Sequence, residues 1–382
     1  MSGPPLVDAA IGAREHLATR VAFLVAGVAI AAWAPLVPLA KARTGLDEGT
    51  LGLVLLCFGV GSLVAMPLAG WCSAKVGGRR VIGCAVTLIC GALPLLAFVE
   101  RPIALAAALL AFGAGLGALD VAMNLQAIVV ERASGRSMMS GFHGLFSVGG
   151  IVGASGVAAA LSAGIDVVTV IAGLSVLLAI AIVATARGLL SAASHDRATP
   201  FELPHGIVLV IGLLAAAAFL VEGSVLDWGA LFLATVRDVP VARASAGYIA
   251  FSIAMTAGRF AGDRIVQRFG GRRVLVAGAL CSAAGLGIVV VVPSSLAGLA
   301  GFALVGIGGS NIVPVLFTCA GRQTAMPENL AVPAMTTMGY AGLLAGPALI
   351  GFTAHATSLV VAFAGLAALM LAVAAMARRL PA

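Results

Sequence analysis

Charged residues are scarce in this chain. Only 10% of its 382 residues are charged, and lysine occurs only twice, as Lys41 and Lys75. About a quarter of the residues of an ordinary soluble domain are charged, so this composition could not cover a surface that faces water. A net charge of +7 could suggest a nucleic-acid partner, but the positive residues stand at alternate ends of the apolar runs, which is a topology signal. The composition therefore predicts a protein embedded in a lipid bilayer, with no nucleic-acid partner.

Motifs for catalysis and metal binding are also missing from the sequence. The chain has no Gly-x-Ser-x-Gly, no His-Glu-x-x-His and no P-loop, and its six cysteines include no Cys-x-x-Cys pair. These absences predict a protein that is not an enzyme, carries no cofactor and binds no metal. Three tryptophans and two tyrosines are also few for a cavity that would pack against sugar rings.

Long apolar runs dominate what is present. Hydrophobic residues make up 61% of the chain, and its mean hydropathy is +1.14. Runs of roughly 20 apolar residues fit transmembrane helices, whereas barrel strands alternate apolar and polar residues over about ten positions. We therefore predict an all-α membrane protein with twelve transmembrane helices. The predicted spans are 17–40, 48–73, 80–99, 102–130, 138–162, 165–187, 206–234, 245–265, 274–293, 296–320, 331–352 and 356–377.

The basic residues predict the orientation of these spans. If the N-terminus lies inside and the spans alternate, 17 of the 22 Lys and Arg residues fall on the inner side. This bias follows the positive-inside rule, and one missed or additional helix would remove it. The prediction is a multi-pass protein with both termini cytoplasmic. The excess of arginine over lysine, together with abundant alanine, suggests a GC-rich bacterial genome and so a bacterial inner membrane.

One short phrase occurs twice. Residues 75–81 (Lys-Val-Gly-Gly-Arg-Arg-Val) return 193 positions later as residues 268–274 (Arg-Phe-Gly-Gly-Arg-Arg-Val), each time between two apolar runs. The polar stretch 191–205 lies between the two copies and predicts a linker. We therefore predict a six-helix bundle over 1–190, a cytoplasmic linker over 191–205 and a second six-helix bundle over 206–382. Two parallel repeats are typical of transporters with a central site.

With twelve helices in two sets of six and this loop, the chain resembles the major facilitator superfamily. The loop is similar to the family's inner-loop motif Gly-x-x-x-Asp-Arg-x-Gly-Arg-Arg, with Ala74 at the Asp position of the first copy and Gln267 at that of the second. Arg259 and Asp263, one helical turn apart, could supply an analogous charge pair in the second half. Segment 142–147 (Phe-His-Gly-Leu-Phe-Ser) resembles helix five of a bacterial subgroup near the fucose permeases. The residues that the resemblance assigns to inner-loop gating are Gly70, Gly77, Arg79, Arg80, Arg259, Asp263, Arg272 and Arg273.

A few ionisable residues fall inside the apolar runs. An ionisable side chain in hydrocarbon is unfavourable by at least a few kcal/mol, so Asp120, Glu222 and His143 are candidates for proton coupling. By their depth, Asp120 and Asn124 on the fourth helix should form a cluster with His143 and Ser147 on the fifth. The alternative is a polar clasp between helices, with hydrogen bonds worth roughly 0.6–2 kcal/mol.

Uncharged polar residues in the predicted spans are candidates for binding a neutral or zwitterionic solute. Each could instead make an ordinary contact between helices. The candidates are Asn124, Ser147, Tyr248, Ser252, Asn311, Thr336 and Tyr340.

Together these features predict a secondary active transporter. A small solute would bind between the halves, which rock to expose it alternately, and with no nucleotide site the energy would come from a gradient, most simply of protons. We expect symport of a sugar or small metabolite; a proton-driven exporter of small amphiphilic compounds is the alternative. A non-transporting sensor would need a signalling domain or a long inner loop, and 191–205 is short. The expected partners are the solute, protons and the lipid bilayer, and we expect a monomer because the site lies within one chain.

Overall fold

The computed structural model describes residues 11–191 and 202–380, and the regular elements in these residues are helices. In chain order they are α1 (Ala13–Ala32), η1 (Ala34–Leu36), α2 (Val37–Thr44), α3 (Glu48–Val76), α4 (Gly78–Phe98), α5 (Pro102–Ser134), α6 (Met139–Ser162), α7 (Val167–Thr185), η2 (Ala186–Gly188), α8 (Gly206–Val236), α9 (Val241–Ala244), α10 (Ala246–Phe269), α11 (Gly271–Val291), α12 (Ser295–Gly309), α13 (Ile312–Arg322), α14 (Glu328–Ala356) and α15 (Leu359–Ala377). Most of the predicted linker lies outside the described residues.

Twelve of these segments correspond to the predicted spans. Within the described residues, eleven are long and apolar enough to cross a bilayer, with α1 continuing through η1 and α2, and α12 continuing into α13. The twelfth is α10, whose 24 residues suffice for a span but include Arg259, Asp263, Arg264 and Arg268. The predicted all-α membrane fold with twelve spans is confirmed.

Two predicted spans are interrupted. The span predicted at 17–40 is divided by a 3₁₀ turn at Pro35, and Pro38 is the second residue of α2, the next helical piece. The span predicted at 296–320 is broken at Ser310 and Asn311. Pro314 has no N–H to donate to the carbonyl of Ser310, while the Ser310 hydroxyl donates to its own helix at Ile307 O, 2.6 Å away. Hydropathy averages over such local breaks, so it could not detect them.

The two halves repeat the same packing. In the first half α5 packs on α3 and α4, and α6 packs on α1; in the second half α12 packs on α10 and α11, and α14 packs on α8. A side chain on Gly113 would collide with the carbonyl of Phe58, and one on Gly306 with that of Phe251. These two contacts are 193 positions apart, the offset of the repeated phrase, and small residues of this kind let membrane helices approach closely.

The repeated loop makes two tight turns. Gly77 joins α3 to α4 and Gly270 joins α10 to α11, with φ of 85° and 83°, in the region where L residues are disfavoured. Arg79 donates to the carbonyls of Leu189 (2.9 Å) and Arg187 (3.1 Å) after α7. Arg272 reaches the carbonyl of Leu380 after α15, 3.5 Å away. Both arginines therefore tie the turn to the end of the last helix in their own half.

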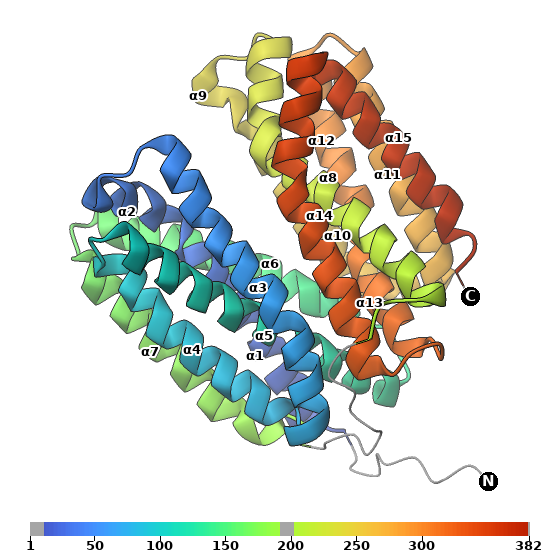
Figure 1. Cartoon of the computed structure of the whole chain (residues 1–382). Helices are drawn as coiled ribbons and strands as arrows, with labels where there is room; N and C mark the ends of the chain where they lie inside the picture. Colours follow the sequence, from blue (N-terminus) through green and yellow to red (C-terminus); the bar gives the residue numbers. More distant parts are fainter. Residues whose placement is uncertain (1–10, 192–201, 381–382) are drawn as a thin grey trace.

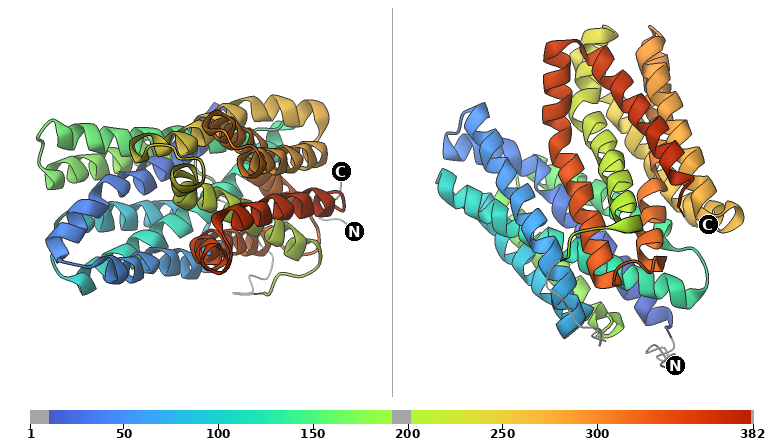
Figure 2. Two further views of the ribbon diagram at one scale, coloured as in Figure 1. Left: turned by 90° about the horizontal axis from the view of Figure 1, so that it is seen from above. Right: turned by 45° about the vertical axis from the view of Figure 1, so that its right-hand side comes forward.

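The two halves meet at one end of the bundle and separate toward the other (Figure 1). We call the end with the α5–α6 and α13–α14 turns the closed end, and the end with α2 and α9 the separated end. Contacts between halves run mainly from α3 to α14 and from α6 to α10. Gly70 of α3 faces the carbonyl of Asn329 and Pro333 on α14, which a larger residue would not permit. Figure 2 shows the same divergence after a 45° turn.

Candidate functional site

Asp120 lies inside the first half, on α5. Asn124 Nδ2, one turn further along, donates to the backbone oxygen of Asp120 at 2.8 Å and to its Oδ1 at 3.3 Å. Asn124 is fully buried and its Oδ1 has no partner, whereas Asp120 is partly exposed. No ion pair joins Asp120 to a cation in the described residues. Among the described residues, the hydrogen bond to this carboxylate therefore comes from a neighbour on its own helix.

Arg259 lies between the halves. It is 6% exposed on α10, and its Nη1 donates to Ser147 Oγ of α6 at 2.6 Å. Its Nη2 lies 3.9 Å from Glu222 Oε2 of α8, a distance too long for a hydrogen bond. Ser147 in turn donates to the carbonyl of His143, 3.2 Å away. One chain of contacts thus runs from α6 through Arg259 to Glu222.

Tyr340 of α14 lies in the same region. Its hydroxyl is near enough to the carboxylates of both Asp120 and Glu222 to be affected by their charge, and its ring packs on Phe219 with centroids 5.8 Å apart. Asp120 belongs to the first half, and Glu222 and Tyr340 belong to the second. The two carboxylates singled out in the sequence therefore face the same region between the halves.

The expected cluster of four residues on the fourth and fifth helices does not form. His143 packs between the rings of Phe23 and Phe317, with centroids 5.2 and 5.4 Å away, and its buried Nε2 has no partner. The reason is that α6 packs chiefly on α1 and makes few contacts with α5. Equal depth on consecutive helices did not imply contact, because helices consecutive in sequence need not be neighbours.

The remaining polar candidates differ in their burial and in their hydrogen-bond partners. Thr336 is fully buried, and its hydroxyl donates to Val332 O of its own helix at 2.8 Å. Tyr248 is partly exposed and stacks on Phe251, and the carbonyl of the partly exposed Ser252 accepts a bond from Thr256.

Asn311 stands at the break between α12 and α13. Its Nδ2 donates to Gly258 O at 3.2 Å and to Ser310 Oγ at 2.9 Å, and its buried Oδ1 has no partner. Close by, a narrow cavity of about 10 Å³ is lined by Glu222, Met255, Ser282 and Ile312 among others, and has room for about one water molecule.

The pair expected between Arg259 and Asp263 is not what the structure shows. Arg259 turns to Ser147 and Glu222, whereas Asp263 Oδ2 accepts the backbone N–H of Gly141, 3.0 Å away, at the start of α6. A carboxylate at a helix N-terminus is stabilised by the unpaired N–H groups there. Asp263 therefore joins the halves by binding a helix end. Arg80 and Arg273 are exposed.

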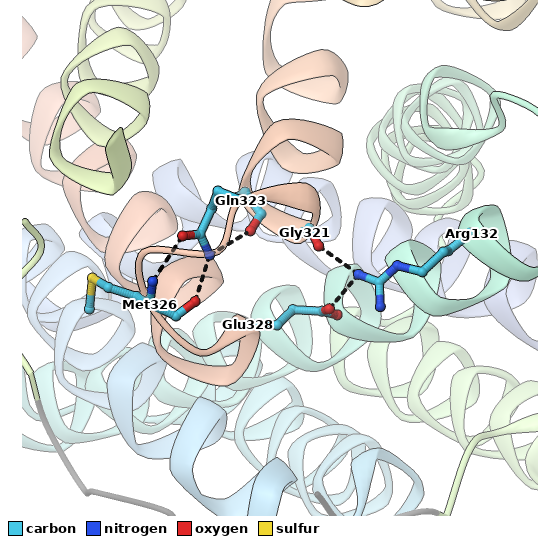
Figure 3. A network of polar contacts seen from close by, with 6 residues as sticks. Arg132, Gly321, Gln323, Met326 and Glu328 are labelled. Carbon is cyan, nitrogen blue, oxygen red and sulfur yellow. Dashed lines mark hydrogen bonds and ion pairs between the residues drawn. The ribbon is translucent and has the colours of Figure 1, made fainter. Parts of the chain in front are cut away.

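A polar lock at the closed end joins the halves, and sequence reasoning missed it. Arg132 of α5 donates to Gly321 O and to Glu328 Oε2 of the second half, both at 2.6 Å (Figure 3). The Gln323 side chain bonds both the N–H and the carbonyl of Met326, at 2.9 and 2.7 Å, and so shapes the turn that presents Glu328.

Glu131 is the buried part of the same lock. It is 4% exposed, and its Oε2 accepts the backbone N–H groups of Met138 and Met139, both at 2.8 Å. Its Oε1 accepts the hydroxyl of Thr318 from α13, at 2.7 Å. The sequence placed Glu131 and Arg132 at a helix end, where charges are ordinary, so only their partners reveal the lock.

Neither a metal nor a disulfide site is present in the described residues. No group of three His, Cys, Asp or Glu side chains is arranged to hold a metal ion, and the six cysteines are unpaired.

Comparison with known sequences shows the relationships of the chain. The profile of the Major Facilitator Superfamily matches residues 21–328. An uncharacterised MFS-type transporter of Yersinia pestis is 54% identical over 368 residues, which cover 96% of each chain. The membrane protein MosC of Rhizobium meliloti is 32% identical, and the match covers 88% of this chain and 83% of MosC.

Solved structures share the fold. The E. coli fucose:proton symporter FucP matches with a TM-score of 0.80, covering 96% of this chain and 98% of that one at 18% identity. FucP in its outward conformation matches with a TM-score of 0.77 at 19% identity, covering 98% of this chain and 100% of that one. The proton:xylose symporter XylE matches at 0.75 and 14% identity, with 96% of this chain and 95% of that one covered. At these identities the likeness concerns the fold, and it confirms the fucose-permease-like architecture expected from the sequence.

Proposed function

Because the chain belongs to the major facilitator superfamily, whose members are membrane transporters and not enzymes, we propose that it is a proton-coupled symporter of a sugar or another small metabolite. The observation that carries the proposal is the placement of Asp120 and Glu222. The two come from different halves, yet both lie near the hydroxyl of Tyr340, and Glu222 also lies 3.9 Å from Arg259 between the halves. Partly buried carboxylates at the plane where the halves move against each other can take up a proton in one state and release it in the other.

The proposed roles follow from the contacts. Asp120 and Glu222 load and release the proton, and His143, whose Nε2 has no partner, is a further proton site. Thr336 is assigned to helix packing, because its hydroxyl is taken by its own helix. The residues proposed to contact the solute are Asn124, Ser147, Tyr248, Ser252, Asn311 and Tyr340.

The closed end is proposed to be the cytoplasmic one. With both termini in the cytoplasm of a bacterial inner membrane, the lock around Glu131 and Arg132 shuts the inner side, and the solute enters from the separated end. Opening of the lock would then release it inside. The division into bundles over 1–190 and 206–382, and a monomeric state, remain part of this proposal.

A proton-driven exporter of small amphiphilic compounds is the second candidate. The surroundings of Glu222 support it, because the side chains there are mainly apolar, such as Val221, Phe251, Met255 and Met370. Such a surface suits an apolar body better than a hydroxyl-rich one.

Proton coupling can be tested in proteoliposomes with a pH dye inside. Addition of a transported solute should acidify the lumen, and an imposed inward proton gradient should drive its accumulation. Glu222→Gln should abolish accumulation, while Asp227→Asn, which changes an exposed carboxylate on the same helix, should not. Wild-type flux that is indifferent to the gradient rejects proton coupling. Flux that runs outward only, against the solute gradient, selects the exporter.

A further inference from the structure

Arg259 is a buried cation at the plane between the halves. Its side chain is 8% exposed, and it contacts Ser147 of the first half and Glu222 of the second. A charged side chain at such depth is unfavourable by a few kcal/mol or more unless it is paired. Its position is therefore one where a solute passing between the halves would meet a fixed positive charge.

The donors of this guanidinium are mostly unused. Arginine carries five N–H donors. One bond is made, from Nη1 to Ser147 at 2.6 Å, while Nε is buried with no partner and Nη2 stands 3.9 Å from the nearest Glu222 oxygen. Glu222 thus balances the charge without satisfying the donors. In the described residues, no group with two acceptor oxygens lies within hydrogen-bond distance of the unused N–H donors of Arg259.

The chemistry of the missing acceptor follows from the shape of the donor group. A guanidinium presents a planar fork that matches a carboxylate through two parallel hydrogen bonds. Stacking would depend on Tyr248 and Tyr340 alone, because Trp33 and Trp71 lie at or near helix ends, and Trp228 lies near the separated end of α8. Charge, rather than an aromatic surface, is the strongest recognition element between the halves.

We propose that Arg259 binds a carboxylate group of the transported solute, and that this group replaces Glu222 as the partner of the guanidinium. This inference rests on the proposed function and narrows the solute from any sugar or small metabolite to one that carries a carboxylate, such as a sugar acid or another hydroxy acid.

Replacement of one anion by another couples the solute to a proton. When the solute carboxylate binds Arg259, Glu222, whose side chain is 32% exposed, loses its partner, and transfer of a proton with the solute keeps the charge between the halves balanced. One carboxylate anion and one proton then move together, with no net charge. The other titratable groups that face Arg259 are His143 from α6 and Tyr248 on its own helix.

The test uses matched pairs of probes on the purified full-length protein. Gluconate is compared with sorbitol, glucuronate with glucose, and lactate with propane-1,2-diol, by thermal stabilisation and by isothermal titration. At least one carboxylate should bind the wild type while its neutral counterpart does not. Arg259→Gln should weaken that binding by about tenfold or more, as loss of a charged hydrogen-bonding partner does. Arg259→Lys should keep part of it. Arg264→Gln, an exposed arginine on the same helix, should leave it unchanged.

A second variant keeps the test decisive if Arg259→Gln fails to fold. Glu222→Gln removes the negative charge that competes for Arg259 and leaves the guanidinium without its ion pair, so this variant should bind the carboxylate at least as tightly as the wild type does. Weaker binding by Glu222→Gln overturns the proposal. Equal binding of the neutral counterpart, or no binding by any carboxylate of the set, overturns it as well.

Failure of this inference and failure of the proposed function give different results. If a neutral sugar binds and drives proton movement in proteoliposomes, the symporter stands and the carboxylate proposal falls. If a carboxylate binds through Arg259 but its flux ignores the proton gradient, the binding site stands and proton coupling falls.

Discussion

Removal of the Thr318 hydroxyl would test the role of the lock at the closed end. This hydroxyl donates to Glu131 Oε1 at 2.7 Å. In the described residues, this is the only hydrogen bond that joins the buried carboxylate of Glu131 to the second half. Thr318→Val keeps the shape of the side chain and removes the hydroxyl. Glu131 would keep its two backbone N–H partners at the start of α6, so the first half itself should be undisturbed.

The size of the effect depends on which hydrogen-bond partners the Glu131 carboxylate has when the lock is closed and when it is open. With the lock closed, Glu131 is 4% exposed, so the oxygen that lost Thr318 would have no replacement partner. A buried acceptor left without its partner is destabilised by about 1–3 kcal/mol, and we take ~1.5 kcal/mol because the other oxygen stays bonded. With the lock open, water can reach the carboxylate and nothing is lost. The equilibrium should therefore shift about tenfold toward the state in which the closed end has opened.

The shift can be measured with spin labels on the turn after α2 and the turn after α8, at the separated end. Double electron–electron resonance in nanodiscs would then report a larger population of short distances for Thr318→Val, because opening one end brings the other together. Thr185→Val is the matched control, since its hydroxyl bonds only within its own helical segment. An unchanged distance distribution, or the same change in the control, would refute the assignment of this contact as part of the lock.

Three further predictions follow from other contacts. Asp120→Asn should lower gradient-driven accumulation by at least about tenfold while sparing solute exchange at equal pH, since only the proton step is removed; loss of both in transport assays would contradict this. Arg132→Gln should open the closed end by no more than about fivefold, because its pair with Glu328 is half exposed, and added salt should reduce that effect in the same spin-label experiment. Gly113→Ala should lower the melting temperature in detergent because its new methyl group would collide with the α3 backbone, whereas Gly91→Ala, which meets open space, should not.

The candidate site was recovered from the sequence only in part. Asp120 and Glu222 could be selected because a carboxylate inside an apolar run is unfavourable and needs a reason. The lock residues Glu131 and Thr318 could not, because a glutamate at a helix end and a threonine within a helix are unremarkable until they meet. Arg259 was selected for the wrong partner, since residues one turn apart can still face different helices.

The sequence by itself determined the number of spans, their orientation relative to one another and the relation between the halves. Each depends on local hydropathy, on the distribution of charge and on a repeat, all of which can be read along one chain. Tertiary structure alone decided which helices are neighbours, which end is closed, and which residues Arg259 contacts. These depend on how each helix rotates about its axis and packs across the repeat, and in a bilayer that choice is made by close contacts such as Gly113 against Phe58, which a periodic apolar pattern does not specify.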